Sequence, residues 1–386
     1  MKKFLALMLA LVMVMGLVAC GTTAPETTAP KTDANESTPA VSDTEYKVAM
    51  ITDYGDITDQ SFNQTTFEAV KAFGEANGIE YKYFKPQSDA DAERVAMIEW
   101  AISDGFNVIV MPGYAFGTAI KEVAPANEDV LFFALDVGAG DFGDWELPAN
   151  VYSAVYQEEL CGYMAGYAAV KLGYKHVGFL GGMAVPAVVR YGYGFVQGVD
   201  AAAVELGIAD QVKIEYVYGN TFSGDADITA VMDTWYGTLG VECVFACGGG
   251  IYSSAAEAAI KVGGKVIGVD VDQAAIIDGL YGEGLTITSA MKGLGPTTID
   301  TLVDVVLNGN WANYGGKIET LGLISADPEA NYVQIPMEST QWSDAFTQED
   351  YKAMVAAMFE GTLVVSDDIS VMPTTTIDVV EYPNIK

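Results

Sequence analysis

Histidine, cysteine and basic residues are scarce in this 386-residue sequence, which has one histidine, four cysteines, and 19 lysines and arginines against 52 aspartates and glutamates. A lone His176 excludes a metal cluster built on histidines. The formal net charge of −33 repels nucleic-acid phosphate and anionic headgroups, so nucleic acid is excluded as a partner. The length exceeds what one hydrophobic core usually covers, and two lobes are therefore expected.

Beyond the N-terminus the sequence also has no long apolar run, and a membrane span would need one of about 20 residues. The run at residues 4–19 follows Lys2 and Lys3 and is short for a span, which predicts a secretory signal peptide over residues 1–19. The small residues before Cys20 resemble a bacterial lipobox, which implies cleavage before Cys20 and lipid attachment to its thiol. The alternative is a plain signal peptide followed by a stray cysteine.

The segment after Cys20 has almost no large apolar side chains and consists mainly of Thr, Ala, Pro, Ser and acidic residues. Such a composition cannot bury enough surface to offset its ordering entropy. Residues 20–45 are therefore predicted to be a lipidated cysteine and a flexible linker. The protein is expected to be held by lipid at the extracytoplasmic face of the cell membrane.

The other cysteines carry no zinc or redox spacing. Cys243 and Cys247 fall in one predicted strand, where four residues span about 13 Å, too far for a disulfide between them. Together with Cys161, they are expected to be small buried hydrophobic residues.

From Tyr46 onward, short apolar runs alternate with amphipathic stretches of helical length, such as residues 62–76, 158–172 and 226–239. The apolar runs do not alternate strictly with polar residues, which indicates strands covered on both faces. The pattern predicts α/β lobes with parallel sheets, whose ligands bind at the carboxyl ends of the strands. The residues at those ends are Asp53, Gly113, Asp136, Asn220, Gly248, Asp270 and Lys292. The alternative is that these residues punctuate turns and cap helices.

The sequence lacks most of the common enzyme motifs. A GxGxxG pattern at residues 138–143 follows a predicted strand, but the next residues have no helical period and include Pro148, so we interpret it as a glycine-rich loop. No GxxxxGK[ST] or GxSxG pattern occurs. His176 opens a predicted strand without a nucleophile nearby and is interpreted as structural. No catalytic residue, metal or cofactor is expected.

One family resemblance runs through the chain. The segments VAMITDYGDITDQSFNQTTFEAVKAF, VIVMPGYAFGTAI, AVYQEELCGYMAGYAA, GNTFSGD, FACGGGIYSS and VIGVDVDQ resemble the basic-membrane-protein/PnrA-like family. These are substrate-binding lipoproteins of ABC importers, and many are purine-nucleoside receptors. The resemblance covers nearly all of residues 46–325. It departs from the family pattern at Thr58, at Gln60 and over residues 183–198.

The resemblance implies a type I periplasmic-binding-protein fold, with two Rossmann-like lobes joined by three crossovers. The N-terminal lobe would take residues 46–152 and 290–320, and the C-terminal lobe 153–289 and 321–386. A ligand would lie between the lobes, where the two sets of strand ends face each other.

The resemblance also implies a set of ligand-binding residues. Asp53 and Asn63 would hydrogen-bond a base, and Phe62 and Phe222 would sandwich its ring. The residues that would hold the ribose and nearby polar edges are Asp136, Gly248, Asp270 and Lys292.

Each role has a structural alternative. Phe62 shares a helical face with Ala69 and Phe73, which is typical of a core aromatic. Asp53 could form only an Asx turn, and Asp270 with Lys292 could be a surface ion pair.

Phe222 has the weakest structural alternative. It stands in a polar loop, and with Ser223 as the helix cap the fourth helical position is Asp227, so a hydrophobic staple is excluded. A role in stacking is therefore favoured.

These observations predict a monomeric receptor that captures a neutral, purine nucleoside by lobe closure and delivers it to an ABC permease and its ATPase. One alternative is the same receptor class with another small polar ligand, such as a sugar or a furanose signal. Another is a surface nucleoside hydrolase or phosphorylase, which the missing nucleophile and metal set disfavour. A structural adhesin would not need acidic residues at strand ends.

Overall fold

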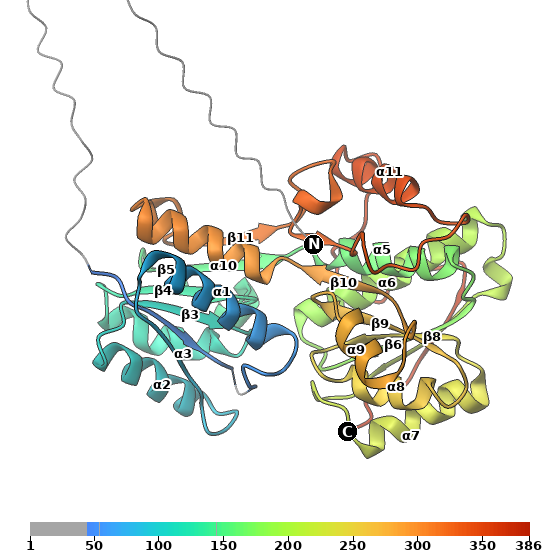
Figure 1. Cartoon of the computed structure of the whole chain (residues 1–386), viewed down its shortest axis with the longest axis horizontal. Coiled ribbons are helices and arrows are strands. Elements are labelled where there is room, and N and C mark those ends of the chain that lie inside the picture. Colours follow the sequence, from blue (N-terminus) through green and yellow to red (C-terminus); the bar gives the residue numbers. More distant parts are fainter. Residues whose placement is uncertain (1–44, 54, 144) are drawn as a thin grey trace, which may run out of the picture. The chain divides into compact units, whose positions relative to one another are not determined.

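The computed structural model describes residues 45–53, 55–143 and 145–386 (Figure 1). The predicted signal peptide at residues 1–19, the lipidation of Cys20 and the linker up to residue 44 lie outside the described residues. The described residues belong to one compact unit. Among their helices, none is both long and apolar enough to cross a membrane.

The first sheet contains only parallel pairs among its described strands, in the order β11-β5-β4-β3-β1-β2 (Figure 1). Its strands are β1 (Val48–Ile51), β2 (Tyr81–Phe84), β3 (Val108–Pro112), β4 (Leu131–Leu135), β5 (Val151–Tyr156) and β11 (Lys317–Leu321).

The second sheet has the order β12-β10-β9-β8-β6-β7-β13, in which β12 alone of the described strands runs antiparallel to its neighbour. Its strands are β6 (His176–Gly181), β7 (Lys213–Tyr218), β8 (Cys243–Cys247), β9 (Lys265–Asp270), β10 (Thr286–Lys292), β12 (Val333–Gln334) and β13 (Asp378–Glu381). Since β2-β1-β3-β4-β5 and β7-β6-β8-β9-β10 follow the same winding, the two lobes are built alike.

Helices cover both faces of each sheet (Figure 1). In the first lobe, α1 and α10 pack on one face, and α2 and α3 on the other. In the second lobe, α5 and α6 pack on one face, and α7, α8 and α9 on the other. The helices are α1 (Phe62–Asn77), α2 (Asp91–Ser103), α3 (Phe116–Val123), α4 (Ala139–Phe142), α5 (Glu158–Lys171), α6 (Pro186–Glu205), α7 (Ala226–Thr234), α8 (Tyr252–Ala259), α9 (Ala274–Tyr281), α10 (Leu294–Leu302) and α11 (Gln348–Phe359).

The strands are buried on both faces, as the apolar runs predict. In β1, Val48 and Met50 join one hydrophobic cluster, while Ala49 and Ile51 join another on the opposite face. Alternate side chains of a strand point to opposite faces, so a strand covered on both sides needs apolar residues throughout. This arrangement confirms the α/β fold of the type I periplasmic-binding-protein class.

The chain crosses between the sheets three times: after β5, after β10 and after β11. The expected boundary at 152/153 falls inside β5, whose pairing with β11 continues to Tyr156 opposite Leu321. The boundary expected at 289/290 falls inside β10, which pairs with β9 as far as Met291. The crossings therefore lie a few residues later, because a strand leaves its sheet only where its ladder ends.

Three further sequence interpretations concern residues 138–143, His176 and the cysteines. Residues 138–143 do not form a plain loop, because Ala139–Phe142 make the single helical turn α4, in which Asp141 Oδ2 accepts from Gly138 N at 2.8 Å. His176 is structural as predicted, with Nε2 2.8 Å from Glu215 Oε1. The three described cysteines are buried and unpaired, as predicted: Cys161, Cys243 and Cys247.

Candidate functional site

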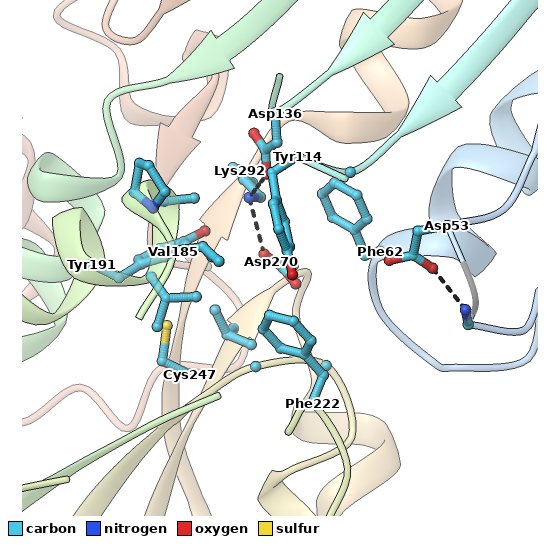
Figure 2. A pocket seen from close by; sticks show the side chains of 18 of the residues that line it. Asp53, Phe62, Tyr114, Asp136, Val185, Tyr191, Phe222, Cys247, Asp270 and Lys292 are labelled. Atoms are coloured by element: carbon cyan, nitrogen blue, oxygen red, sulfur yellow. Dashed lines mark hydrogen bonds and ion pairs between the residues drawn. The ribbon is translucent and has the colours of Figure 1, made fainter. Parts of the chain in front are cut away.

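A cavity of about 240 Å³ lies where the carboxyl ends of strands from both sheets meet (Figure 2). The structure brings all the predicted ligand-binding residues together in its lining. They are Asp53, Phe62, Asn63, Asp136, Phe222, Gly248, Asp270 and Lys292. Of the remaining strand-end residues, Gly113 lines the cavity and Asn220 is not among the lining residues.

Two of the strand-end carboxylates sit on strained backbone. Asp136 has a φ of 61° and Asp270 a φ of 65°, both in the left-handed region. That region costs an ordinary residue about 1–2 kcal/mol, although aspartate tolerates it better than most. Backbone strain of this kind concentrates at binding sites, where the surrounding structure holds it in place. Asp136 follows β4 of the first lobe and Asp270 ends β9 of the second, so the two lobes present matching carboxylates.

One end of the cavity is formed by Asp53 and Asn63. Asp53 Oδ1 accepts from Gly55 N at 2.7 Å, so the Asx turn weighed above does form. The same oxygen accepts from Asn63 Nδ2 at 3.1 Å, and that amide also donates to Asp59 Oδ2 at 2.9 Å. Asp59 further accepts from Asn63 N and Gln64 N, which fixes the start of α1. The turn thus positions an amide and a carboxylate side by side in the cavity wall.

Two phenylalanines flank the middle of the cavity. Figure 2 shows Phe62, from the first turn of α1, and Phe222, from the loop after β7, on different sides of the cavity. Phe222 packs against Gly182 and Gly248, and a Cβ at Gly182 would overlap its Cδ1 atom. Glycine at position 182 therefore makes the room in which this ring lies.

The loop of Phe222 corrects one detail of the sequence interpretation. The cap of α7 is Asp225, whose Oδ1 accepts from Asp227 N and Ile228 N, and not Ser223. Asp225 caps the helix in place of Ser223 because its carboxylate accepts hydrogen bonds from two backbone amides of the first turn, which have no partner within the helix. Phe222 still lies too far before the cap for a hydrophobic staple.

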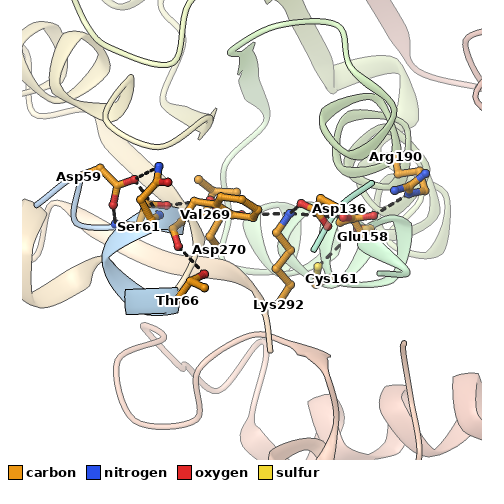
Figure 3. Close-up of polar contacts among 12 residues, drawn as sticks. Asp59, Ser61, Thr66, Asp136, Glu158, Cys161, Arg190, Val269, Asp270 and Lys292 are labelled. Carbon is orange, nitrogen blue, oxygen red and sulfur yellow. Dashed lines mark hydrogen bonds and ion pairs between the residues drawn. The ribbon is translucent and has the colours of Figure 1, made fainter. Parts of the chain in front are cut away.

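Lys292 is the buried centre of the site's charges. Its side chain is 3% exposed, and Nζ forms an ion pair with Asp136, with further contacts to Glu158 Oε1 at 3.4 Å and Asp270 Oδ1 at 3.6 Å (Figure 3). Nζ also lies 5.0 Å from the ring centroid of Phe62. Burial lowers the pKa of Lys292, but the carboxylates outweigh it and hold the pKa well above its usual value. The ammonium is therefore charged. Because Lys292 is buried, its pairing with Asp270 is not the surface ion pair considered as an alternative.

The lobe bounds implied by the resemblance put Asp270 and Lys292 in different lobes, whereas the structure puts them in the same lobe. β9 and β10 are neighbours in one sheet, so these two residues share a lobe. Each of the two residues also has a contact with the first lobe: Lys292 with Asp136, and Asp270 Oδ2, which accepts from Ser61 Oγ at 2.7 Å. Burial outweighs the opposing effects of Lys292 and Ser61 and raises the pKa of Asp270. Asp136 Oδ1 is buried and has no hydrogen-bond partner among the described residues.

Several lining residues were not predicted. Tyr114 directly follows the strand-end Gly113, and this position could have identified it. Arg190 and Tyr191 lie on α6, away from any strand end, so no sequence pattern pointed to them.

The comparisons with known proteins agree with this geometry. The model of the family described as "ABC transporter substrate-binding protein PnrA-like" matches residues 46–356. The chain is 27% identical over 301 residues to the "ABC transporter nucleoside-binding protein BmpA" of Lactococcus lactis subsp. cremoris, covering 72% of this chain and 80% of that protein. It is 28% identical over 290 residues to "Basic membrane protein B" of Borreliella burgdorferi, covering 73% of this chain and 80% of that one.

Among solved structures, the fold is similar to an ABC transporter solute-binding protein from Aeropyrum pernix K1. That match has a TM-score of 0.65 and 19% identity, and it covers 84% of this chain and 88% of the other. At this level of identity the likeness concerns the fold. The family match over most of the chain is the stronger finding: the chain belongs to the PnrA-like family of ABC transporter substrate-binding proteins, which makes it an extracytoplasmic receptor that binds a small molecule and works with a permease, and not an enzyme.

Proposed function

We propose that this receptor binds an uncharged purine nucleoside in the cavity and delivers it to its permease and ATPase. The carrying observation is the order of groups along the cavity: Asp53 with Asn63 at one end, two phenylalanines in the middle, and Asp136 with Lys292 beyond them. A nucleoside presents its groups in the same order, with a polar base edge, a flat ring and a ribose that carries hydroxyl donors. A Lactococcus relative is named a nucleoside-binding protein, which supports this choice.

The individual roles follow from chemistry. Asp53 accepts a hydrogen bond from a ring N–H, and Asn63 lies beside it. Phe62 and Phe222 stack on the base, which is worth roughly 1–3 kcal/mol per base. The buried, unpartnered Oδ1 of Asp136 accepts from a ribose hydroxyl, since a buried acceptor without a donor is costly. Gly248 and Asp270 complete the wall around the ribose.

Lobe closure supplies the transport signal. Ligand contacts come from both lobes, so the ligand binds the closed state better and shifts the population toward it. We propose that the protein acts as a monomer, tethered through lipid at Cys20.

Calorimetric titration of the domain from residue 45 onward tests the proposal, with inosine, guanosine, a pyrimidine nucleoside, free bases and ribose as probes. We expect a purine nucleoside to bind most tightly, a pyrimidine nucleoside more weakly, and ribose alone very little. Tight binding of a free sugar without any nucleoside binding would overturn the proposal and favour a sugar receptor.

A further inference from the structure

The far end of the cavity, away from Asp53, is formed by the start of α6. Figure 2 shows Asp53 and Tyr191 toward opposite ends of the view, and Arg190 precedes Tyr191 in the same helix. Arg190 and Lys292 are the cations among the described lining residues. Two cations beside the expected ribose position would ordinarily indicate a phosphate site, which makes their surroundings decisive.

Arg190 uses only one of its N–H groups in a hydrogen bond to the described residues. Its Nε donates to Glu158 Oε2 at 2.6 Å, and its side chain is 19% exposed. A guanidinium carries five N–H donors, and the Nη groups of Arg190 have no hydrogen bond to another described residue. Because Arg190 lines the cavity, these donors can serve an acceptor oxygen of a ligand.

Glu158 lies behind the cavity and contacts both cations. It is fully buried and is not among the lining residues. One of its oxygens accepts from Arg190 at 2.6 Å, and the other lies 3.4 Å from Lys292 Nζ (Figure 3). A single carboxylate at the start of α5 thus joins the helix α6 to the strand β10.

The charges of this cluster do not favour an anion. In ionised form, Glu158, Asp136 and Asp270 bring three negative charges against the two positive charges of Arg190 and Lys292. Most of the cluster is buried, so this excess is screened less than it would be at the surface. Without Glu158, the same groups would be neutral overall.

We propose that Arg190 contacts the ligand at its ribose end and that Glu158 is the positioning residue that makes the site selective for an uncharged nucleoside over its 5′-monophosphate. The inference rests on the proposed nucleoside function. Glu158 accepts a hydrogen bond from Nε of Arg190 and thereby orients the guanidinium. Its negative charge, behind the cavity wall, offsets one of the two positive charges. Arg190 then offers donors to a hydroxyl oxygen, while a phosphate dianion meets net negative charge.

The test is the Glu158→Gln variant, which keeps the shape of the side chain and removes its charge. Affinities for inosine and for inosine 5′-monophosphate are measured by calorimetry, and by competition where binding is weak. Burial outweighs Arg190 and Lys292 and raises the pKa of Glu158, so the assay is run at pH 8, on the alkaline side of neutrality, to favour the ionised carboxyl. We expect the ratio of monophosphate to nucleoside affinity to rise at least tenfold in this variant.

Glu159→Gln is the matched control. Glu159 occupies the same turn of α5 and is also buried, but it has no hydrogen bond or ion pair with Arg190 or Lys292 among the described contacts and interacts with Arg190 only through longer-range electrostatics. Its substitution is expected to leave the affinity ratio unchanged. If both variants shift the ratio equally, or if Glu158→Gln weakens both ligands by one common factor, the assignment of selectivity to Glu158 is wrong.

Arg190→Gln provides an independent arm should Glu158→Gln fail to fold, which thermal unfolding would reveal. We expect this variant to weaken nucleoside binding about tenfold and monophosphate binding more. Unchanged affinity for both ligands would overturn the contact with Arg190. The proposed function fails separately, if the wild-type protein binds no nucleoside at all.

Discussion

Ser61 and Asp270 join the two lobes through one buried hydrogen bond, in which Ser61 Oγ donates to Asp270 Oδ2 over 2.7 Å. Ser61 precedes α1 of the first lobe and is fully buried, while Asp270 ends β9 of the second. In the proposed open form both groups would be hydrated, so we expect this bond in the closed arrangement only. It therefore favours closure as long as the carboxylate keeps its partner.

The Ser61→Ala variant removes the donor from a buried carboxylate in the closed state only. Hydrogen bonds to charged groups contribute about 1.5–3 kcal/mol, so we expect nucleoside affinity to fall about tenfold or more. Calorimetry measures the change, and Ser103→Ala, at an exposed position of α2, serves as the control. Equal affinities for wild type and Ser61→Ala would show that this bond does not contribute to closure.

Removing the ring of Phe222 tests the stacking role directly. The loss of one stacked face, at about 1–3 kcal/mol, should weaken purine nucleoside binding by at least tenfold in Phe222→Ala. Phe359→Ala is the control, because that ring is 48% exposed on α11 and far in sequence from the cavity residues. If Phe222→Ala binds as tightly as wild type, the aromatic pair does not hold the base.

Gly182 should affect ligand affinity through the ring of Phe222, because the missing side chain at this position leaves space for that ring. A methyl group in Gly182→Ala would overlap Cδ1 of Phe222 and displace the ring into the cavity. We expect a loss of affinity similar to that of Phe222→Ala, with little change in thermal stability. A Cβ at Gly279 meets nothing within 4 Å, so Gly279→Ala should bind normally. Normal binding by Gly182→Ala would place the bound conformation of Phe222 elsewhere.

The fold was largely predictable because its signals are local. Apolar runs of strand length, each covered on both faces, alternate with helical stretches, and that pattern alone predicts parallel α/β lobes. The carboxyl ends of the strands then indicated Asp136, Asp270 and Lys292, all of which meet in the cavity. The lobe boundaries were less predictable, because the end of β5 depends on its pairing with β11, far away in the sequence.

The far end of the cavity could not be predicted, for a physical reason. Arg190 reaches it from a helix face, and its partner Glu158 lies on another helix that packs against the first. Arg190 lies well after the end of β6, and although Glu158 comes two residues after the end of β5, the pairing of the two residues depends on tertiary contact. The positive φ of Asp136 and Asp270 is equally invisible in a sequence, since it results from turns that the surrounding structure enforces.

The proposed lipid anchor at Cys20 can be tested by removing its thiol. If the lipobox interpretation is right, Cys20→Ser prevents lipid attachment and releases the protein from the membrane fraction. Cell fractionation and metabolic labelling with a radioactive fatty acid measure both effects. A lipid chain contributes about 0.8 kcal/mol per buried methylene, and the strongly acidic body gains nothing from an anionic bilayer. Unchanged labelling of Cys20→Ser would contradict the lipidation of this residue.

Glu159 makes the stability of the protein depend on pH, and a comparison of wild type with a Glu159 variant isolates this effect. Burial raises the pKa of Glu159 from its ordinary 4.5 to about 7, and its Oε2 has no hydrogen-bond partner among the described residues. The folded state therefore holds this proton where the unfolded chain has released it. The stabilisation is complete below pH 4.5 and is lost as the pH rises to about 7.

The Glu159→Gln variant cannot lose that proton, so its stability relative to wild type should increase between pH 5 and pH 8. The shift corresponds to at most about 3 kcal/mol, at 1.36 kcal/mol per pKa unit. Urea unfolding at the two pH values measures the difference, and Glu99→Gln, an exposed position on α2, controls for the general effect of removing a charge. A pH-independent difference between wild type and Glu159→Gln would mean that the carboxyl titrates outside this range.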